Sequence, residues 1–212
     1  MDKIDYRIHK LFPVPVYHST IPAPDILTFN KLINNEWVAP GYLAYDDNHQ
    51  ESEDRHILNN SSFSSIKKHI QDHIENYAYE VLGTSRKHIW QITTSWVNQS
   101  RPGHDHGPHF HANSILSGVV YLQSVDTAEI NFHRSASHVS LWNTVLLDFE
   151  GYNELNVDVI SIHPSTNEIL IFPSNLTHSV NLNKSKETRY SLAFNVFPRG
   201  VFGEGGNSEL TV

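Results

Sequence analysis

The chain has 212 residues, with 15 lysines and arginines, 23 aspartates and glutamates and 15 histidines, and its net charge is −8 when the histidines are neutral. This length suits one domain, and the acidic balance disfavours nucleic acid as a partner. The sequence has no cysteine, which excludes disulfides, thiolate catalysis and cysteine metal sites. Neither a membrane span nor a signal-peptide pattern is present, so we expect a cytoplasmic protein without membrane contact.

The N-terminal part of the sequence, residues 1–87, predicts an extended and helical support. Two prolines keep residues 7–20 extended. Apolar residues recur at helical spacing over 24–37, whereas residues 40–60 are polar and loop-like. The strongest helix is predicted over 62–82, where apolar side chains recur every three or four residues and a glycine follows.

From residue 88 onward, short β-rich runs alternate with turn residues. We expect eight strands, over 89–98, 115–123, 128–133, 139–148, 155–162, 168–173, 177–182 and 189–197. Such a series of short strands predicts a β-sandwich or jelly roll. The predicted architecture is therefore mainly β, with the N-terminal helices packed against the β-rich body and a mobile tail from residue 203.

Histidines concentrate in one short segment, at His104, His106, His109 and His111. On a strand, His109 and His111 would point to the same face, and His178 follows a buried strand that could reach them across a barrel mouth. Three imidazoles on one metal leave open positions for substrate or oxygen. The alternative is a solvated loop with incidental histidines and a hydrogen-bonded turn histidine at 178.

A second polar feature lies on the predicted strand 189–197. Arg189 and Ser191 share one face of a strand that is otherwise mostly apolar. A buried guanidinium needs a partner. That partner is either an acidic side chain of the protein, such as Asp148 or Glu150, or a ligand carboxylate held by Arg189 with help from the Ser191 hydroxyl.

In this order and spacing, the motifs resemble those of iron(II)- and 2-oxoglutarate-dependent dioxygenases, and most closely a branch of small oxygenases from bacteria and phages. The segments that carry the resemblance are 11–16 (LFPVPV), 95–98 (SWVN), 102–114 (PGHDHGPHFHANS), 117–122 (SGVVYL), 172–178 (FPSNLTH) and 189–195 (RYSLAFN). All of these segments except 11–16 lie within residues 88–198, which the resemblance mainly covers.

The resemblance implies one oxygenase domain over 1–212, with a cupin-like double-stranded β-helix core over 88–198. It also implies an Fe(II) and 2-oxoglutarate enzyme that uses molecular oxygen to hydroxylate an unidentified small-molecule, peptide or protein substrate, with release of succinate and CO2. Many members of the superfamily form homodimers. If the chain is phage-encoded, the cytoplasm would be that of the host.

The resemblance further assigns residues to the site. It implies that His109 and His178 are iron ligands and that Arg189, with Ser191, binds the distal carboxylate of 2-oxoglutarate. By the same comparison, Asn98 and Tyr121 contact the cosubstrate.

One departure from the family pattern concerns His111, which stands where the usual motif has Asp or Glu. His111 is either a third neutral ligand, or a bystander in a site of two histidines and water, or the first ligand in a shifted register with Asn113 replacing the carboxylate. We favour His109, His111 and His178 as the metal ligands, because imidazole is a better iron(II) donor than an amide. We expect iron affinity to fall below about pH 6.5 as the ligands protonate.

Two other functions, and several residues beside the histidines, also enter the prediction. The alternatives are a three-histidine cupin-type metalloenzyme that does not use 2-oxoglutarate and a non-catalytic jelly-roll binding module. The segment 104–106 either contacts substrate or forms a solvated loop, and the sequence favours the loop. Phe110 could line the pocket, whereas core packing is favoured for Trp96 and Trp142.

Overall fold

The computed structural model describes residues 4–39, 49–134, 148–206 and 208–212. Its larger sheet has seven strands, in the order β1 (Tyr17–Thr20), β9 (Glu168–Pro173), β6 (Leu116–Gln123), β11 (Arg189–Arg199), β4 (Ile89–Ser100), β3 (His49–Ser52) and β2 (Trp37–Val38). Its smaller sheet has the order β5 (His106–His109), β10 (His178–Val180), β7 (Ile130–His133) and β8 (Val159–Ile162). All paired strands run antiparallel.

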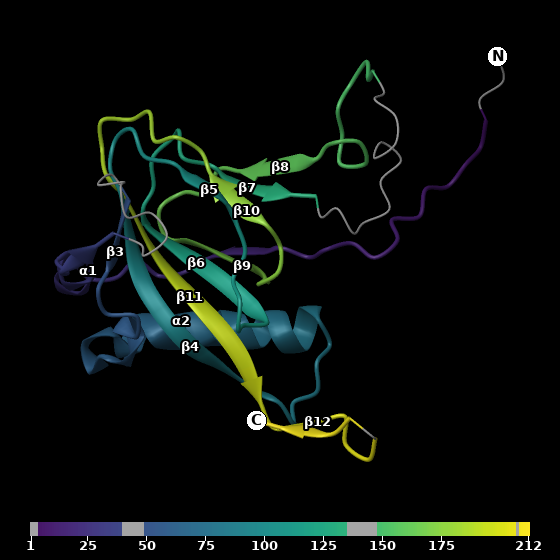
Figure 1. The fold of residues 1–212 in the computed structure, drawn as a ribbon, viewed down its shortest axis with the longest axis horizontal. Coiled ribbons are helices and arrows are strands. Elements are labelled where there is room, and N and C mark those ends of the chain that lie inside the picture. The colour runs from purple at the N-terminus through teal and green to yellow at the C-terminus, as the bar shows by residue number, and fades with distance from the viewer. Residues whose placement is uncertain (1–3, 40–48, 135–147, 207) are drawn as a thin grey trace.

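The helices belong to the N-terminal part of the chain. They are α1 (Ile26–Ile33), two short 3-10 turns at Ile57–Asn59 and Ser61–Phe63, and α2 (Ser64–Glu75), which continues as a π-helical segment over Asn76–Val81. Helix α2 lies across one face of the larger sheet, and the smaller sheet covers the other face (Figure 1). The helices stay on one side, so the space between the two sheets is left for a site.

Residue alternation along the strands separates the two faces of the larger sheet. In β11, Leu192, Phe194 and Val196 pack with the buried isoleucines of α2 in one hydrophobic cluster. A second cluster lies between the sheets and contains Val119, Tyr121, Ile130, Phe132, Leu170 and Phe172. Because successive side chains of a strand point to opposite faces, the odd-numbered residues of β11 from Arg189 to Asn195 face the space between the sheets.

The predicted architecture, mainly β with N-terminal helices, is confirmed. Strands β4, β6, β7, β8, β9, β10 and β11 fall within the predicted runs or extend them by a few residues. The predicted strand 139–148 lies almost wholly outside the described residues, and the tail forms a hairpin of β12 (Val201–Phe202) and β13 (Leu210–Thr211).

Two features of the N-terminal part differ from the prediction. Helix α1 is shorter than 24–37, because Trp37 pairs with Ser52 in a two-stranded extension of the sheet. Strand β3 lies in the predicted loop 40–60 and pairs with β4. Both differences arise from pairing with a distant strand, which local periodicity does not report. No helix in the described segments is long and apolar enough to span a membrane.

Candidate active site

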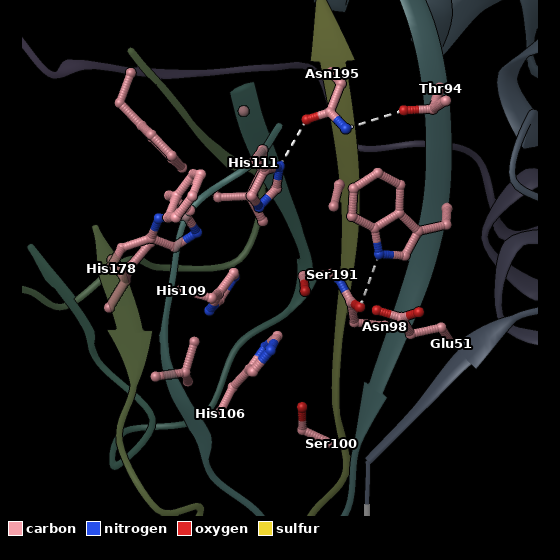
Figure 2. A pocket seen from close by; sticks show the side chains of 18 of the residues that line it. Glu51, Thr94, Asn98, Ser100, His106, His109, His111, His178, Ser191 and Asn195 are labelled. Carbon is pink, nitrogen blue, oxygen red and sulfur yellow. Dashed lines mark hydrogen bonds between the residues drawn. The ribbon is translucent and has the colours of Figure 1, made fainter. Parts of the chain in front are cut away.

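Three histidines converge between the two sheets. One ligand atom of each of His109, His111 and His178 lies within 4.8 Å of the other two, the distance expected for a shared metal ion. The ring centroids are 5.5 Å apart for His109 and His111, 4.3 Å for His109 and His178, and 5.2 Å for His111 and His178. Figure 2 shows the three rings on the same side of the cavity.

Strand pairing explains why these residues meet. His178 is directly opposite His109 in the antiparallel pair of β10 and β5. His111 lies just beyond the end of β5, and its backbone N–H donates to the carbonyl of Ser174, 2.9 Å away, at the end of β9. The three side chains are therefore held by backbone contacts from three different segments.

The hydrogen bonds of the Nδ1 atoms fix how the rings are oriented. Nδ1 of His109 donates to the carbonyl of Gly107, and Nδ1 of His178 donates to the carbonyl of Leu176, both at 2.9 Å. Nδ1 of His111 lies 2.6 Å from Oδ1 of Asn195. When Nδ1 carries the proton, the lone pair is on Nε2, so all three rings can offer Nε2 to one ion.

Burial keeps two of these imidazoles neutral. Burial, together with the neighbouring histidines, lowers the pKa of His178 to about 3. Burial also lowers the pKa of His111, although the bond to Asn195 and the nearby Glu51 carboxylate oppose this. Protons therefore compete with a metal at these two residues only at a pH below the ordinary histidine pKa near 6.5.

The larger sheet forms the opposite wall of a cavity of about 600 Å³. Alternate residues of β4 and β11 face it, among them Thr94, Trp96, Asn98, Arg189, Ser191 and Asn195. Glu51, Asn98, Ser191 and Tyr121 form one row across four strands, because each is paired in register with the next. The site thus has a histidine wall and a polar wall that face each other.

Arg189 is the main positive charge of the polar wall. It is 4% exposed, and its guanidinium lies 5.0 Å from the centroid of the fully buried Tyr121 ring. In the described part of the chain, neither Nε of Arg189 nor the Tyr121 hydroxyl has a hydrogen-bond partner, and no carboxylate forms an ion pair with Arg189. Asp148 and Glu150, the expected internal partners, are exposed. Burial raises the pKa of Tyr121 to about 12, so its hydroxyl stays protonated.

Asn98 and Trp96 act as a pair on the same wall. The Trp96 indole N–H donates to Oδ1 of Asn98 at 3.0 Å, which leaves the amide NH2 of Asn98 without a partner among the described residues (Figure 2). The Trp96 ring lines the cavity 5.8 Å from the His111 ring. The expectation that Trp96 packs in the core is therefore wrong, because the alternation of β4 turns its even-numbered residues towards the cavity.

Other sequence expectations have mixed outcomes. Phe110 lines the cavity mouth, as does His106, which stacks on His109 with a centroid distance of 3.9 Å. His104 is 2% exposed, so the segment 104–106 is not a fully solvated loop. Asn113 is exposed in a left-handed conformation (φ 56°) and does not line the cavity. This placement argues against the hypothesis that Asn113 replaces the carboxylate ligand in a shifted register. Trp142 lies outside the described residues.

Three residues of the site were not assigned a role from the sequence. Glu51 is buried in the cavity wall and forms an ion pair with Arg55, whose guanidinium lies 6.0 Å from the centroid of the Trp96 ring. Asn195 holds His111. Asn195 is the last residue of the segment 189–195 that carries the family resemblance, so the sequence did point to this residue. Nothing in the sequence pointed to Glu51 or Arg55, because residues 40–60 were predicted as a loop.

Comparisons with known proteins agree with this geometry. Residues 94–195 match the family model described as "Putative 2OG-Fe(II) oxygenase". No curated protein matches the sequence.

Among solved structures, the chain is similar to SnoN, an α-ketoglutarate-dependent epimerase from nogalamycin biosynthesis, with 14% identity and a TM-score of 0.58 over 87% of this chain and 78% of SnoN. It is similar to HygX of Streptomyces hygroscopicus, crystallised with nickel and 2-oxoglutarate, with 10% identity and a TM-score of 0.58 over 86% and 82%. It is also similar to a prolyl-4-hydroxylase of Pseudomonas putida, with 13% identity and a TM-score of 0.53 over 86% and 92%.

At these identities, the structural likeness bears on the fold and confirms the predicted double-stranded β-helix. The family match covers β4 to β11, the segment that carries the three histidines and Arg189. Residues 94–195 of the chain belong to the 2OG-Fe(II) oxygenase family.

Proposed function

We propose that the protein is an iron(II)- and 2-oxoglutarate-dependent hydroxylase whose metal is held by His109, His111 and His178. The proposal assigns Arg189, with Ser191, to the distal carboxylate of 2-oxoglutarate, and Asn98 and Tyr121 to further contacts with this cosubstrate. The observation that carries it is the buried guanidinium of Arg189, which lines the same cavity as the histidines and pairs with no carboxylate of the described chain.

The donor set suits iron(II). Three neutral imidazoles are good donors for this metal, and three protein ligands leave positions free for a cosubstrate and oxygen. Because the three imidazoles are neutral, the metal and its protein ligands carry a net charge of +2, whereas a carboxylate ligand would reduce this net charge. A dianionic cosubstrate is attracted to that charge.

The polar wall suits a dicarboxylate. Arg189 can donate two parallel hydrogen bonds to one carboxylate, and its Nε has no partner in the described part of the chain. The Tyr121 hydroxyl and the amide NH2 of Asn98 are further donors without acceptors among the described residues. Buried donors without partners are rare in native proteins and are expected where a ligand supplies the acceptor.

The bound iron and 2-oxoglutarate would supply the oxidising chemistry, with succinate and CO2 as coproducts. The residues of the chain bind and orient. Ile130 and Phe172 line the cavity, where Phe172 packs edge-on against His178, and these apolar side chains would exclude water. Small molecules and peptides are both candidate substrates.

The described segments support one oxygenase domain. Strands β1, β2 and β3 come from residues before 88, yet they belong to the same sheet as β4, β6, β9 and β11. Glu51 of β3 also lines the cavity. We therefore propose that the N-terminal part completes the site as well as supporting the core.

The test is an anaerobic titration with iron(II) followed by 2-oxoglutarate. The proposal expects a visible metal-to-ligand charge-transfer band in the wild-type protein, and succinate on admission of oxygen. Arg189→Ala should need much more 2-oxoglutarate to form the band, whereas Arg86→Ala, which removes an exposed guanidinium paired with Glu80, should match the wild type. Iron binding with no band at any 2-oxoglutarate concentration would instead favour a three-histidine metalloenzyme of another kind.

A further inference from the structure

The three histidines differ in what accepts their Nδ1 protons. For His109 and His178 the acceptor is a backbone carbonyl two residues earlier in the chain, and a carbonyl oxygen can only accept. For His111 the acceptor is a side chain, Asn195, which lies far away in the sequence on β11. An amide has both a donor and an acceptor end, so the tautomer of His111 depends on which end faces it.

The surroundings of Asn195 orient its amide. The NH2 group donates to Oγ1 of Thr94 at 3.0 Å, and Oδ1 accepts from the Ser117 hydroxyl at 2.8 Å as well as from His111. Figure 2 shows this amide between β4 and the His111 ring. Oδ1 is thus turned towards His111 and NH2 away from it.

A series of hydroxyl groups continues from Asn195 to the segment that positions His111. Because Ser117 donates to Asn195, it accepts from Ser174 at 2.8 Å, and Ser174 accepts from Ser114, also at 2.8 Å. The carbonyl of Ser174 accepts the backbone N–H of His111. The same network therefore holds the backbone and the ring of His111.

We infer that Asn195 is a positioning residue, which keeps the proton of His111 on Nδ1 and directs the Nε2 lone pair to the metal. It does for His111 what backbone carbonyls do for the other two ligands. His111 stands where the family pattern has a carboxylate, which needs no tautomer, so a histidine there requires this extra partner. The inference rests on the proposed metal site, but the tautomer itself belongs to the metal-free protein.

The consequence for metal binding follows from the tautomer. With the proton on Nε2, His111 could not offer that atom to the ion, and the ring would also be free to rotate. Loss of such an outer partner typically weakens metal affinity by about 10- to 100-fold. Asn195→Ala should therefore weaken iron(II) binding by about that factor, and Asn195→Asp, which keeps the acceptor oxygen, should restore it.

Asn131 offers a matched control. It is a buried asparagine on β7 with two side-chain hydrogen bonds, to Asn181 and from Ser161, both at 2.6 Å, and it does not line the cavity. Asn131→Ala removes a similar number of bonds without touching the histidines. A loss of affinity that is merely structural would appear in both alanine variants.

Two measurements test the inference. Nitrogen-15 NMR of the metal-free protein above pH 7 should show His111 with its proton on Nδ1 in the wild type, Asn131→Ala and Asn195→Asp, and a mixture of tautomers in Asn195→Ala. Anaerobic iron(II) competition with a coloured chelator should show the affinity loss in Asn195→Ala alone. An Nε2 proton on His111 in the wild type, or unchanged tautomer and affinity in Asn195→Ala, or an equal loss in Asn131→Ala would overturn the inference. If the wild type binds no iron while the NMR pattern holds, the metal site fails and the role of Asn195 in setting the tautomer stands.

Discussion

His178 and His109 occupy directly opposed positions in the antiparallel pair of β10 and β5, although they are far apart in the sequence. This pairing makes two imidazoles neighbours as soon as the smaller sheet forms. His111 has no such strand partner, since it lies beyond the end of β5 and is held by Ser174 and Asn195. The site therefore combines a pair fixed by the sheet with a third histidine fixed by one backbone hydrogen bond and one side chain.

The first prediction concerns His111. If it is a ligand, His111→Ala should weaken anaerobic iron(II) binding by more than about 10-fold, since even the loss of a residue that only supports a ligand has such an effect. His111→Asp restores the carboxylate of the family pattern and should bind iron better than the alanine variant. Equal affinity in the wild type and His111→Ala would instead indicate a site of two histidines and water.

The second prediction concerns the hydroxyl of Tyr121. Tyr121→Phe should raise the dissociation constant of 2-oxoglutarate about 10- to 100-fold, because a hydrogen bond to a charged group contributes about 1.5–3 kcal/mol. The free energy of unfolding should not fall, because this hydroxyl has no partner in the described part of the chain. Both quantities can be measured, by titration and by urea unfolding.

Tyr77 provides the control for this substitution. Its hydroxyl donates to the carbonyl of Pro15 at 2.7 Å, far from the polar wall. Tyr77→Phe should lower stability by about 1 kcal/mol and leave 2-oxoglutarate binding unchanged. The assignment of Tyr121 is wrong if its variant behaves like that of Tyr77.

The third prediction is a pH dependence of stability in the metal-free protein. The pKa of His178 is about 3 in the folded state, against a reference value near 6.5 when unfolded, so the unfolded state binds more protons in this range. Stability is full above pH 6.5 and is lost as the pH falls towards 3, by about 1 kcal/mol for His178 alone at pH 5.5. Unfolding measured at pH 7.5 and 5.5 should show this loss, and His178→Asn should reduce it. If the wild type and His178→Asn lose the same free energy of unfolding between pH 7.5 and pH 5.5, His178 is not the cause of the loss.

The fourth prediction concerns Gly118 in β6. A Cβ at this position would lie 2.2 Å from Cζ of Phe194 and 2.8 Å from the carbonyl oxygen of Leu170. Neither atom can move away easily, because the Phe194 ring is fully buried and the carbonyl belongs to β9. Gly118→Ala should therefore lower the free energy of unfolding by about 1–3 kcal/mol, as overpacking does in other cores. Gly151→Ala, where a Cβ meets nothing within 4 Å, should have little effect.

The sequence predicted most of the β-rich body because its strands alternate or are continuously apolar. Strand β9 is a buried apolar run and β11 alternates between apolar and polar residues, and both were predicted close to their observed bounds. Strands β3 and β5 were missed because they are short, polar and recognisable only by what they pair with. Pairing partners are a property of the whole fold and are absent from local periodicity.

The site was predictable to the extent that its chemistry is unusual in the sequence. A cluster of histidines and an arginine on an apolar strand are rare enough to be noticed, and the structure brings His109, His111, His178 and Arg189 to one cavity. Glu51 and Arg55 enter the site only because β3 pairs with β4. The role of Asn195 depends on a hydrogen bond across the fold, which no spacing in the sequence reports.

X-ray absorption at the iron edge of the anaerobic iron(II) protein counts the imidazoles around the metal, which is the quantity on which the proposed site depends. We expect outer-ring scattering from three imidazoles in the wild type and from two in His111→Ala, with oxygen ligands in the remaining positions. Two imidazoles in both proteins, or a closed four-coordinate set in the wild type that does not change when 2-oxoglutarate is added, would contradict the account.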